Sequence, residues 1–251
     1  MNSILFLLFG VLAVANAATL PLNLDPRIVN GVNVNPGEIP YQVSLQTRGS
    51  HFCGGSVLNA NYILTAAHCV VNQNVNTIVV VAGTVNLQSR TLVRQAVKII
   101  VHEKYNPPNN WINDIALIKV DKPLVLNSQI SAVPLPRLNE NISAGSVAIV
   151  SGWGRLQSGG PTTNQLKKAR IYITDQTVCR RANGNIFDTQ ICANDPSNNR
   201  GACQGDSGGP LTVNGKIVGI VSWSEGCGLP NRPTVYTRVP SYISWIQQHA
   251  V

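Results

Sequence analysis

The chain has 251 residues, of which 12% are charged and 44% hydrophobic, and it carries a formal net charge of +8 at pH 7. This length suits one large or two small domains with a sizeable core, and the composition excludes an intrinsically disordered protein. The basic residues are dispersed, which excludes a nucleic-acid-binding stripe with interleaved aromatic residues and leaves weak attraction to acidic polymers as an alternative.

The N-terminus has the pattern of a secretory signal peptide. An apolar run covers residues 4–14, and the small residues Ala15 and Ala17 fit a signal-peptidase site after Ala17. A membrane anchor is the alternative, but the run is shorter than the roughly 20 residues that span a bilayer. We therefore expect residues 1–17 to be a signal peptide and the protein to be secreted and extracellular, without membrane attachment.

The segment ATLPLNLDPRIVNG follows, and it contains the bond between Arg27 and Ile28. A trypsin-like enzyme cuts easily after an arginine in such a segment, yet most Arg-Ile bonds are ordinary linker. The bond gains a meaning only if a buried carboxylate awaits the new amino group.

Short β-rich runs then alternate with Gly, Asn and Pro turns almost to the C-terminus. This rhythm predicts an all-β barrel or sandwich protein. Two helices are expected: one over residues 175–182 and one at the C-terminus, residues 241–250, where apolar residues recur at helical spacing. The clearest strand runs cover residues 41–46, 77–83, 114–120, 146–154 and 216–224.

Six cysteines fit an extracellular protein. An even count in a secreted chain indicates disulfides, although six cysteines allow about 15 pairings. A metal site is disfavoured because no CxxC pair exists, and because His68 and Cys69 would point to opposite faces of a strand. We expect no metal and no other cofactor. The six are Cys53, Cys69, Cys179, Cys192, Cys203 and Cys227.

Three residues could together perform acyl transfer, which needs a nucleophile, a base, an orienting group and oxyanion donors. Ser207 lies in the glycine-rich turn GDSGG, His68 ends the strand-like run YILTAAH, and Asp114 precedes a run apolar enough to be a buried strand. A carboxylate entering such a strand must be paired, and an imidazole N–H suits it. Considered singly, the turn is only a turn and the histidine a packed residue.

The motifs IVNG, TAAHC, DIAL, GWG, GDSGGP and SWS occur in that order from Ile28 to the C-terminal helix. In this the chain resembles the chymotrypsin-like (trypsin-fold) serine peptidases. The resemblance implies two six-stranded antiparallel β-barrels packed together, with the active site between them and a C-terminal helix. It places an activation propeptide at residues 18–27 and a peptidase domain at 28–251, with the first barrel at about 28–133, the second at about 134–240 and the helix at about 241–250.

The resemblance also implies a role for each motif residue. Ser207 would be the nucleophile, His68 the general base and Asp114 its orienting partner, with the N–H groups of Gly205 and Ser207 as the oxyanion hole. Cleavage after Arg27 would free the Ile28 ammonium to pair with Asp206, so the uncut chain would be a zymogen. The implied disulfides are Cys53–Cys69, Cys179–Cys192 and Cys203–Cys227.

The implied specificity pocket carries no charge. Its floor would be Gly201 and Ala202, one wall Ser222, Trp223 and Ser224, and the far wall Thr234. A buried lysine or arginine would lack a partner there, which disfavours trypsin-like cleavage. The side chains of Ser224 and Thr234 narrow the slot, so we expect an elastase-like preference for small or medium aliphatic P1 residues; large apolar or aromatic P1 residues are the alternative.

Several further expectations complete the sequence prediction. A catalytically dead binding homologue on the same fold is the alternative of another class, although the three triad residues are present. The expected partners are protein and peptide substrates, an activating trypsin-like protease and protein inhibitors, with no nucleic acid, and the protein is expected to be a monomer. Asn141 begins a glycosylation sequon, Glu225 lies at the pocket rim, and His51, His102 and His249 are assigned packing or surface roles.

Overall fold

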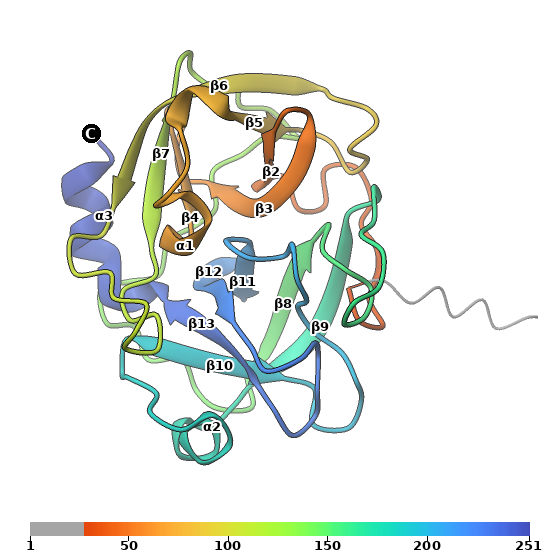
Figure 1. The fold of residues 1–251 in the computed structure, drawn as a ribbon, viewed down its shortest axis with the longest axis vertical. Coiled ribbons are helices and arrows are strands. Elements are labelled where there is room, and N and C mark those ends of the chain that lie inside the picture. Colours follow the sequence, from red (N-terminus) through yellow and green to blue (C-terminus); the bar gives the residue numbers. More distant parts are fainter. Residues whose placement is uncertain (1–27) are drawn as a thin grey trace, which may run out of the picture.

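The computed structural model describes residues 28–251, so the predicted signal peptide and propeptide lie outside the described residues. Strands dominate, and a short helix ends the chain (Figure 1). None of the helices within residues 28–251 combines the length and apolar character needed to cross a membrane.

The bounds of the elements are as follows. The strands are β1 (Val32–Asn33), β2 (Gln42–Thr47), β3 (Ser50–Val57), β4 (Tyr62–Thr65), β5 (Ile78–Ala82), β6 (Leu92–Val101), β7 (Ala116–Val120), β8 (Val147–Gly152), β9 (Lys167–Ile173), β10 (Gln190–Asn194), β11 (Pro210–Val213), β12 (Lys216–Trp223) and β13 (Thr234–Arg238). The helices are α1 (Ala67–Val70), α2 (Gln176–Asn183) and α3 (Ile243–His249), with 3-10 turns at Val75–Thr77 and Val239–Tyr242.

Two closed antiparallel barrels make up the fold. In the first barrel the strand order is β2-β3-β4-β7-β6-β5, and β5 returns to pair with β2. In the second barrel the order is β9-β10-β13-β12-β11-β8, and β8 closes the ring by pairing with β9. The short strand β1 pairs with the first two residues of β9. The predicted pair of six-stranded antiparallel barrels with a C-terminal helix is thus confirmed.

Local sequence explains one predicted helix and corrects one predicted strand. The α2 helix starts where expected because Asp175 caps it, accepting the N–H groups of Thr177 and Val178 at 2.8 and 3.1 Å. The run ending at His68, predicted as one strand, instead stops at Thr65 and turns into α1. This helical turn, not a strand, orients the His68 side chain.

Each end of the described chain packs into the barrel farther from it in sequence. Ile28 is fully buried in the core of the second barrel. Tyr242, Ile243 and Ile246, from the 3-10 turn and α3, instead join the core of the first barrel, and Figure 1 shows α3 beside β7. The two ends therefore fasten the barrels together.

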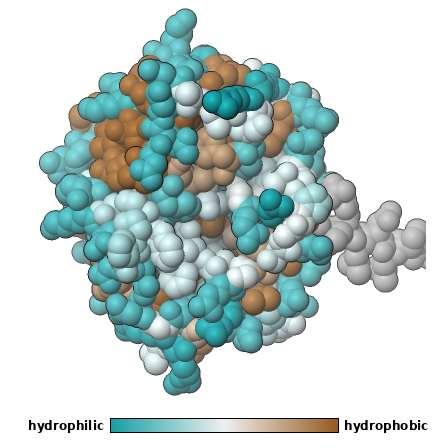
Figure 2. All heavy atoms as spheres, in the orientation of Figure 1, coloured by the Kyte–Doolittle hydropathy of each residue, from teal (hydrophilic) through white to brown (hydrophobic). Residues whose placement is uncertain are grey.

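The space-filling view in Figure 2 shows the same face as Figure 1. Hydrophobic side chains gather over the upper-left part of the first barrel, and residues of intermediate hydropathy occupy the middle of the face, between the barrels. In Figure 1 this middle region lies between the loops of the two barrels.

Candidate active site

Asp114 is a buried carboxylate at the point where the two barrels meet. Its Oδ1 accepts the backbone N–H of His68 at 2.9 Å, and its Oδ2 lies 2.7 Å from His68 Nδ1. The hydroxyl of Ser222, on β12 of the second barrel, donates to the same Oδ2 at 2.5 Å. Thr237 on β13 donates its hydroxyl to the Asp114 carbonyl at 2.6 Å, so the second barrel holds both the backbone and the side chain of this residue.

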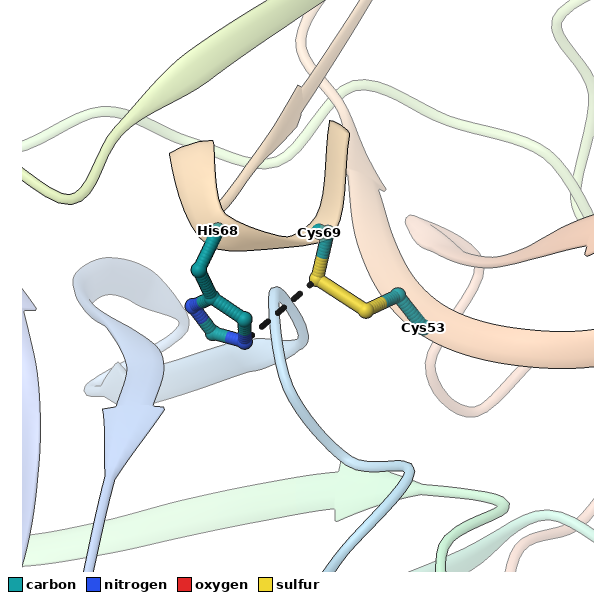
Figure 3. A group of neighbouring side chains, drawn as sticks. All are labelled: Cys53, His68 and Cys69. Atoms are coloured by element: carbon teal, nitrogen blue, oxygen red, sulfur yellow. Dashed lines mark hydrogen bonds between the residues drawn. A yellow bond between two sulfur atoms is a disulfide. The ribbon is translucent and has the colours of Figure 1, made fainter. Parts of the chain in front are cut away.

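The pairing with Asp114 fixes the proton on the His68 ring. A carboxylate only accepts hydrogen bonds, so Nδ1 carries the proton and Nε2 is left as an acceptor. The His68 side chain is about one quarter exposed, and its Nε2 lies 3.7 Å from Cys69 Sγ (Figure 3). A ring with this tautomer and this exposure can take a proton from a neighbouring hydroxyl.

The cluster of His68 with Cys53 and Cys69 has the ligand types of a metal site, but its two sulfur atoms are joined to each other. Figure 3 shows the Cys53–Cys69 disulfide beside the imidazole. A disulfide sulfur is not a thiolate, so only one metal-ligating side chain remains. The two neighbours also lie on the same helical turn, which corrects the strand geometry expected from the sequence.

Ser207 lies in the loop before β11, and this loop packs on the first barrel. Its carbonyl accepts the N–H of Gly54 at 2.7 Å. The next residue, Gly208, has a φ of +77°, and a Cβ there would lie 2.2 Å from Thr65 Oγ1. The serine is therefore held beside the segment that leads from β4 into α1. Among residues 28–251, its hydroxyl makes no hydrogen bond to His68; such bonds often tighten only when substrate binds.

Two backbone N–H groups in this loop are available to a ligand. Within the described part of the chain, neither Gly205 nor Ser207 donates its N–H to an acceptor. Gly205 has a φ of +95°, and a Cβ there would meet Gly154 Cα at 3.0 Å, so only glycine fits. Two free donors beside a hydroxyl are what an oxyanion hole requires.

His51 binds the carbonyl group of Gly205, a contact that the sequence analysis did not foresee. Its Nε2 donates to the Gly205 carbonyl at 2.8 Å, and its Nδ1 lies 2.8 Å from the Ser44 hydroxyl. Burial lowers the pKa of His51, which favours the neutral ring. The carbonyl can only accept, so Nε2 carries the proton and Ser44 donates to Nδ1.

Asp206 is a second buried carboxylate, and only backbone groups satisfy it. Its Oδ1 accepts the N–H of Gly154 and its Oδ2 that of Cys203, at 2.8 and 2.9 Å. No Lys, Arg or His of residues 28–251 forms an ion pair with it. Burial raises the pKa of Asp206 to about 7, although these two hydrogen bonds work in the opposite direction.

The start of the described chain reaches the floor of the predicted pocket. Ile28 shares the core of the second barrel with Ala202, and Val29 forms a β-bridge with Gly201. Asn30 then donates its side-chain N–H to the carbonyl of Asn199 at 2.6 Å. Arg27 lies outside the described residues.

The floor and walls of the predicted pocket carry no carboxylate. Gly201 has a φ of +150°, a conformation that L side chains rarely adopt, and Gly228 Cα would lie 3.3 Å from a Cβ there. Ala202 and Thr234 are buried, and Ser224 donates its hydroxyl to the Gly226 carbonyl at 2.6 Å. The backbone at Gly201 therefore disfavours any side chain, charged or not, at the floor of the predicted pocket.

An aromatic contact extends the pocket wall beyond the predicted residues. The ring of Trp223 lies 5.9 Å from that of Trp111, which is 39% exposed and has a φ of +50°. Trp111 was missed, although a tryptophan three residues before Asp114 was a signal that could have found it. At the rim, Glu225 pairs with Arg232 at 3.2 Å and so is already partly neutralised.

Disulfides brace the loops on which these residues lie. The structure contains the three pairs that the resemblance implies: Cys53–Cys69, Cys179–Cys192 and Cys203–Cys227. The first connects β3 to α1, and the third connects the loop before Ser207 to the loop after β12. The predicted sequon residue Asn141 is exposed in the loop before β8.

Two β-barrels, a His–Asp pair at their junction and a nearby serine beside two free N–H groups define a class of protein, the serine proteases. A family model described as trypsin matches residues 28–246. Pig (Sus scrofa) trypsin is 41% identical over 91% of this chain and 97% of its own length. Chymotrypsin-2 of Vespa crabro is 40% identical over 88% and 99%, and trypsin Blo t 3 of Blomia tropicalis is 42% identical over 89% and 86%. The chain belongs to the trypsin family and is a serine protease.

The Ser222 contact yields a first prediction. Replacing Ser222 with alanine removes a hydrogen bond to the buried Asp114 carboxylate, and such charge-assisted bonds contribute about 1.5–3 kcal/mol. We expect kcat on a peptide substrate to fall roughly tenfold to a hundredfold, with little change in KM. Ser56→Ala is the matched control, because Ser56 is also buried but its hydroxyl has no hydrogen-bond partner within residues 28–251. Equal kcat values for the two folded variants would contradict the role of Ser222.

Proposed function

We propose that the protein is a secreted serine endopeptidase in which Ser207 attacks the substrate, His68 acts as the base and Asp114 orients His68. The observation that carries the proposal is the short contact between His68 Nδ1 and the buried Asp114 carboxylate. It leaves Nε2 as an acceptor on the exposed side of the ring. The nearby loop offers a hydroxyl and two unused N–H groups, which supports the remaining roles.

Each proposed step follows from the chemistry of these groups. Ser207 Oγ forms a bond to the carbonyl carbon while its proton moves to His68 Nε2. The Gly205 and Ser207 N–H groups stabilise the oxyanion, and the His68 imidazolium faces the Asp114 carboxylate. The tetrahedral intermediate then expels the amine, which takes the proton from His68. A water molecule repeats the sequence on the acyl-enzyme and restores Ser207.

Replacing the nucleophile tests this assignment directly. Ser207→Ala should lower kcat/KM by on the order of 10³ or more and abolish covalent labelling by an organophosphate, because no activated hydroxyl remains. Thermal unfolding should change little, since this hydroxyl makes no hydrogen bond in residues 28–251. A wild-type protein that is not labelled after activation would favour the non-catalytic homologue instead.

We further propose that residues 1–17 are a signal peptide and that cleavage after Arg27 by a trypsin-like protease activates a zymogen. The Ile28 ammonium would then pair with Asp206 and order the oxyanion loop. Support comes from Ile28, which is buried in the same barrel, and from Asp206, which is buried without a cationic partner among residues 28–251. Burying an unpaired carboxylate is costly, so a new ammonium would be strongly attracted.

The pH dependence of the uncut chain tests the role of Asp206. Its pKa is about 7 in the folded chain against an ordinary value of 3.8, so the folded state binds a proton that the unfolded state releases. The contribution of Asp206 to the free energy of unfolding is therefore fully present below pH 4. It falls by about 4 kcal/mol as the pH rises from 4 through 7.

The measurement is urea unfolding of Arg27→Gln protein, which cannot be cut after residue 27, from pH 4 to pH 8. The Asp206→Asn variant in the same background is the control, since an amide does not titrate. We expect the difference in unfolding free energy between the two to change with pH in the stated direction. Parallel curves would contradict a titrating Asp206. Full proteolytic activity of the Arg27→Gln protein would contradict activation by cleavage.

The neutral pocket supports a preference for uncharged apolar P1 residues. We propose small or medium aliphatic residues, because Thr234 narrows the far wall and Ser224 the near one; large apolar or aromatic residues are the second candidate. Relatives at about 40% identity include both a trypsin and a chymotrypsin, so overall likeness does not decide this point. A guanidinium bound above Gly201 would lack a counter-charge.

A panel of peptides that differ only at P1 tests the pocket. We expect Ala, Val or Leu to be cleaved faster than Phe, and Arg and Lys to be the slowest. Thr234→Gly should raise kcat/KM for Phe relative to Leu by about tenfold or more, because a few methyl groups in such a slot are worth 1–3 kcal/mol. Fast cleavage after Arg by the wild type would contradict the neutral floor.

The remaining expectations rest on the family. Peptide substrates and protein inhibitors are the partners that a trypsin-family protease implies. We propose that the protein is secreted and acts as a monomer.

A further inference from the structure

Ion pairs are distributed unevenly between the two halves of the molecule. Six lysine or arginine residues form ion pairs with carboxylates of residues 28–251, and all six lie between residues 137 and 232. The first barrel has seven such residues, and none of them has a carboxylate of residues 28–251 within 4.0 Å. They are Arg48, Arg90, Arg94, Lys98, Lys104, Lys119 and Lys122.

Four of these seven residues lie on β6, on β7 and in the loop just after β7, and we call them the basic face: Arg94, Lys98, Lys119 and Lys122. Lys98 and Lys119 are direct partners across the two strands. Arg94 donates from all three guanidinium nitrogens to the backbone carbonyls of Val93, Lys122 and Pro123, so it holds the loop that bears Lys122 beside β6. Arg94 and Lys98 are four residues apart on β6, and the register of β6 with β7 shifts between Ala96 and Lys98.

The basic face works against the stability of the sheet. Like charges directly opposite each other on antiparallel strands are destabilising. Lys119 is partly compensated by the Tyr62 ring, 5.4 Å below its ammonium, but Lys98 is exposed. The nearby carboxylate of Asp121 accepts the backbone N–H of Gln95 at 3.1 Å and pairs with none of the four cations. A local arrangement that costs stability is expected where a surface serves a partner.

We propose that the basic face binds a linear sulfated polysaccharide. Three lysine side chains grouped around a bound arginine match a flexible chain with closely spaced anionic groups, since each ammonium can bind an oxyanion as a point charge. The exposed apolar side chains of β6 are Val93 and Val97. They offer no aromatic surface on which bases could stack, which disfavours a single-stranded nucleic acid.

The position of the basic face leaves the active site open. β7 begins two residues after Asp114, whereas Lys119 and Lys122 lie at and beyond its far end. At the usual rise, five residues of extended chain place Lys119 about 16 Å from Asp114, and Lys122 follows in the loop beyond β7. Figure 1 shows β6 across the top of the first barrel, on the side away from the second barrel. A polysaccharide held there would retain the protease on a matrix without covering its cleft.

The test compares two triple variants with the same net charge. The first is Lys98→Gln, Lys119→Gln and Lys122→Gln. The matched control is Arg137→Gln, Arg170→Gln and Arg181→Gln, which neutralises three exposed cations of the second half. The probe is heparin, immobilised on a column and free in solution, with a sulfonate cation exchanger as the reference surface.

We expect the first variant to bind heparin at least tenfold more weakly than the wild type. The slope of log Kd against log [NaCl] should also fall by about two to three, because binding through fewer charge contacts releases fewer counterions. The control variant should bind heparin nearly as the wild type does, while both variants elute alike from the sulfonate exchanger.

Three results would overturn the proposal. Equal loss of heparin affinity in both triple variants would show attraction by net charge alone. Unchanged affinity in both would show that the basic face does not bind heparin. Tighter binding of single-stranded DNA than of heparin, lost only in the first variant, would identify a nucleic-acid surface instead. Cleavage of a small peptide by the first variant serves to show that it has folded, whatever the binding result.

Discussion

The burial of the Asp114 carboxylate constrains the rest of the structure. A charge removed from water is costly unless its oxygens are satisfied, and here the donors come from both barrels. His68 supplies two of them from α1, while Ser222 supplies the third from β12. Separating the barrels would leave this carboxylate short of partners. The same contacts that hold the barrels together also set the tautomer of His68.

Asp206 shows how differently a second buried carboxylate can be treated. Asp114 has an imidazole and a hydroxyl as partners, whereas Asp206 has two backbone N–H groups and no cation among the described residues. The pKa of about 7 reflects this shortage. The Asp206 carboxylate is also tightly packed, because a Cβ at Gly154 would lie 2.6 Å from its oxygen Oδ2. The loop bearing Ser207 is therefore arranged around a group that still lacks a counter-charge.

Local patterns in the sequence were sufficient for an all-β fold, the two barrels followed from the resemblance, and the contacts between the loops followed from neither. Short β-rich runs between turn residues predicted the strands, and residues 175–182 were predicted as a helix, because both patterns depend on neighbours in the chain; the structure shows that Asp175 caps this helix. The contact of His51 with Gly205 joins residues 154 positions apart, and no local pattern announces it. Likewise α1 was predicted as strand, since its apolar residues are too few to display a helical period.

The packing of each end of the described chain into the more distant barrel has a consequence for how the protein folds during synthesis. The core of the first barrel includes Tyr242, Ile243 and Ile246, which the ribosome adds after all strands of both barrels. The first barrel cannot complete its interior until these residues have been synthesised, although its own strands are made much earlier. Such long-range closure slows folding and favours assembly of both barrels as one cooperative unit. Truncating a few C-terminal residues should therefore damage the barrel at the opposite end of the sequence first.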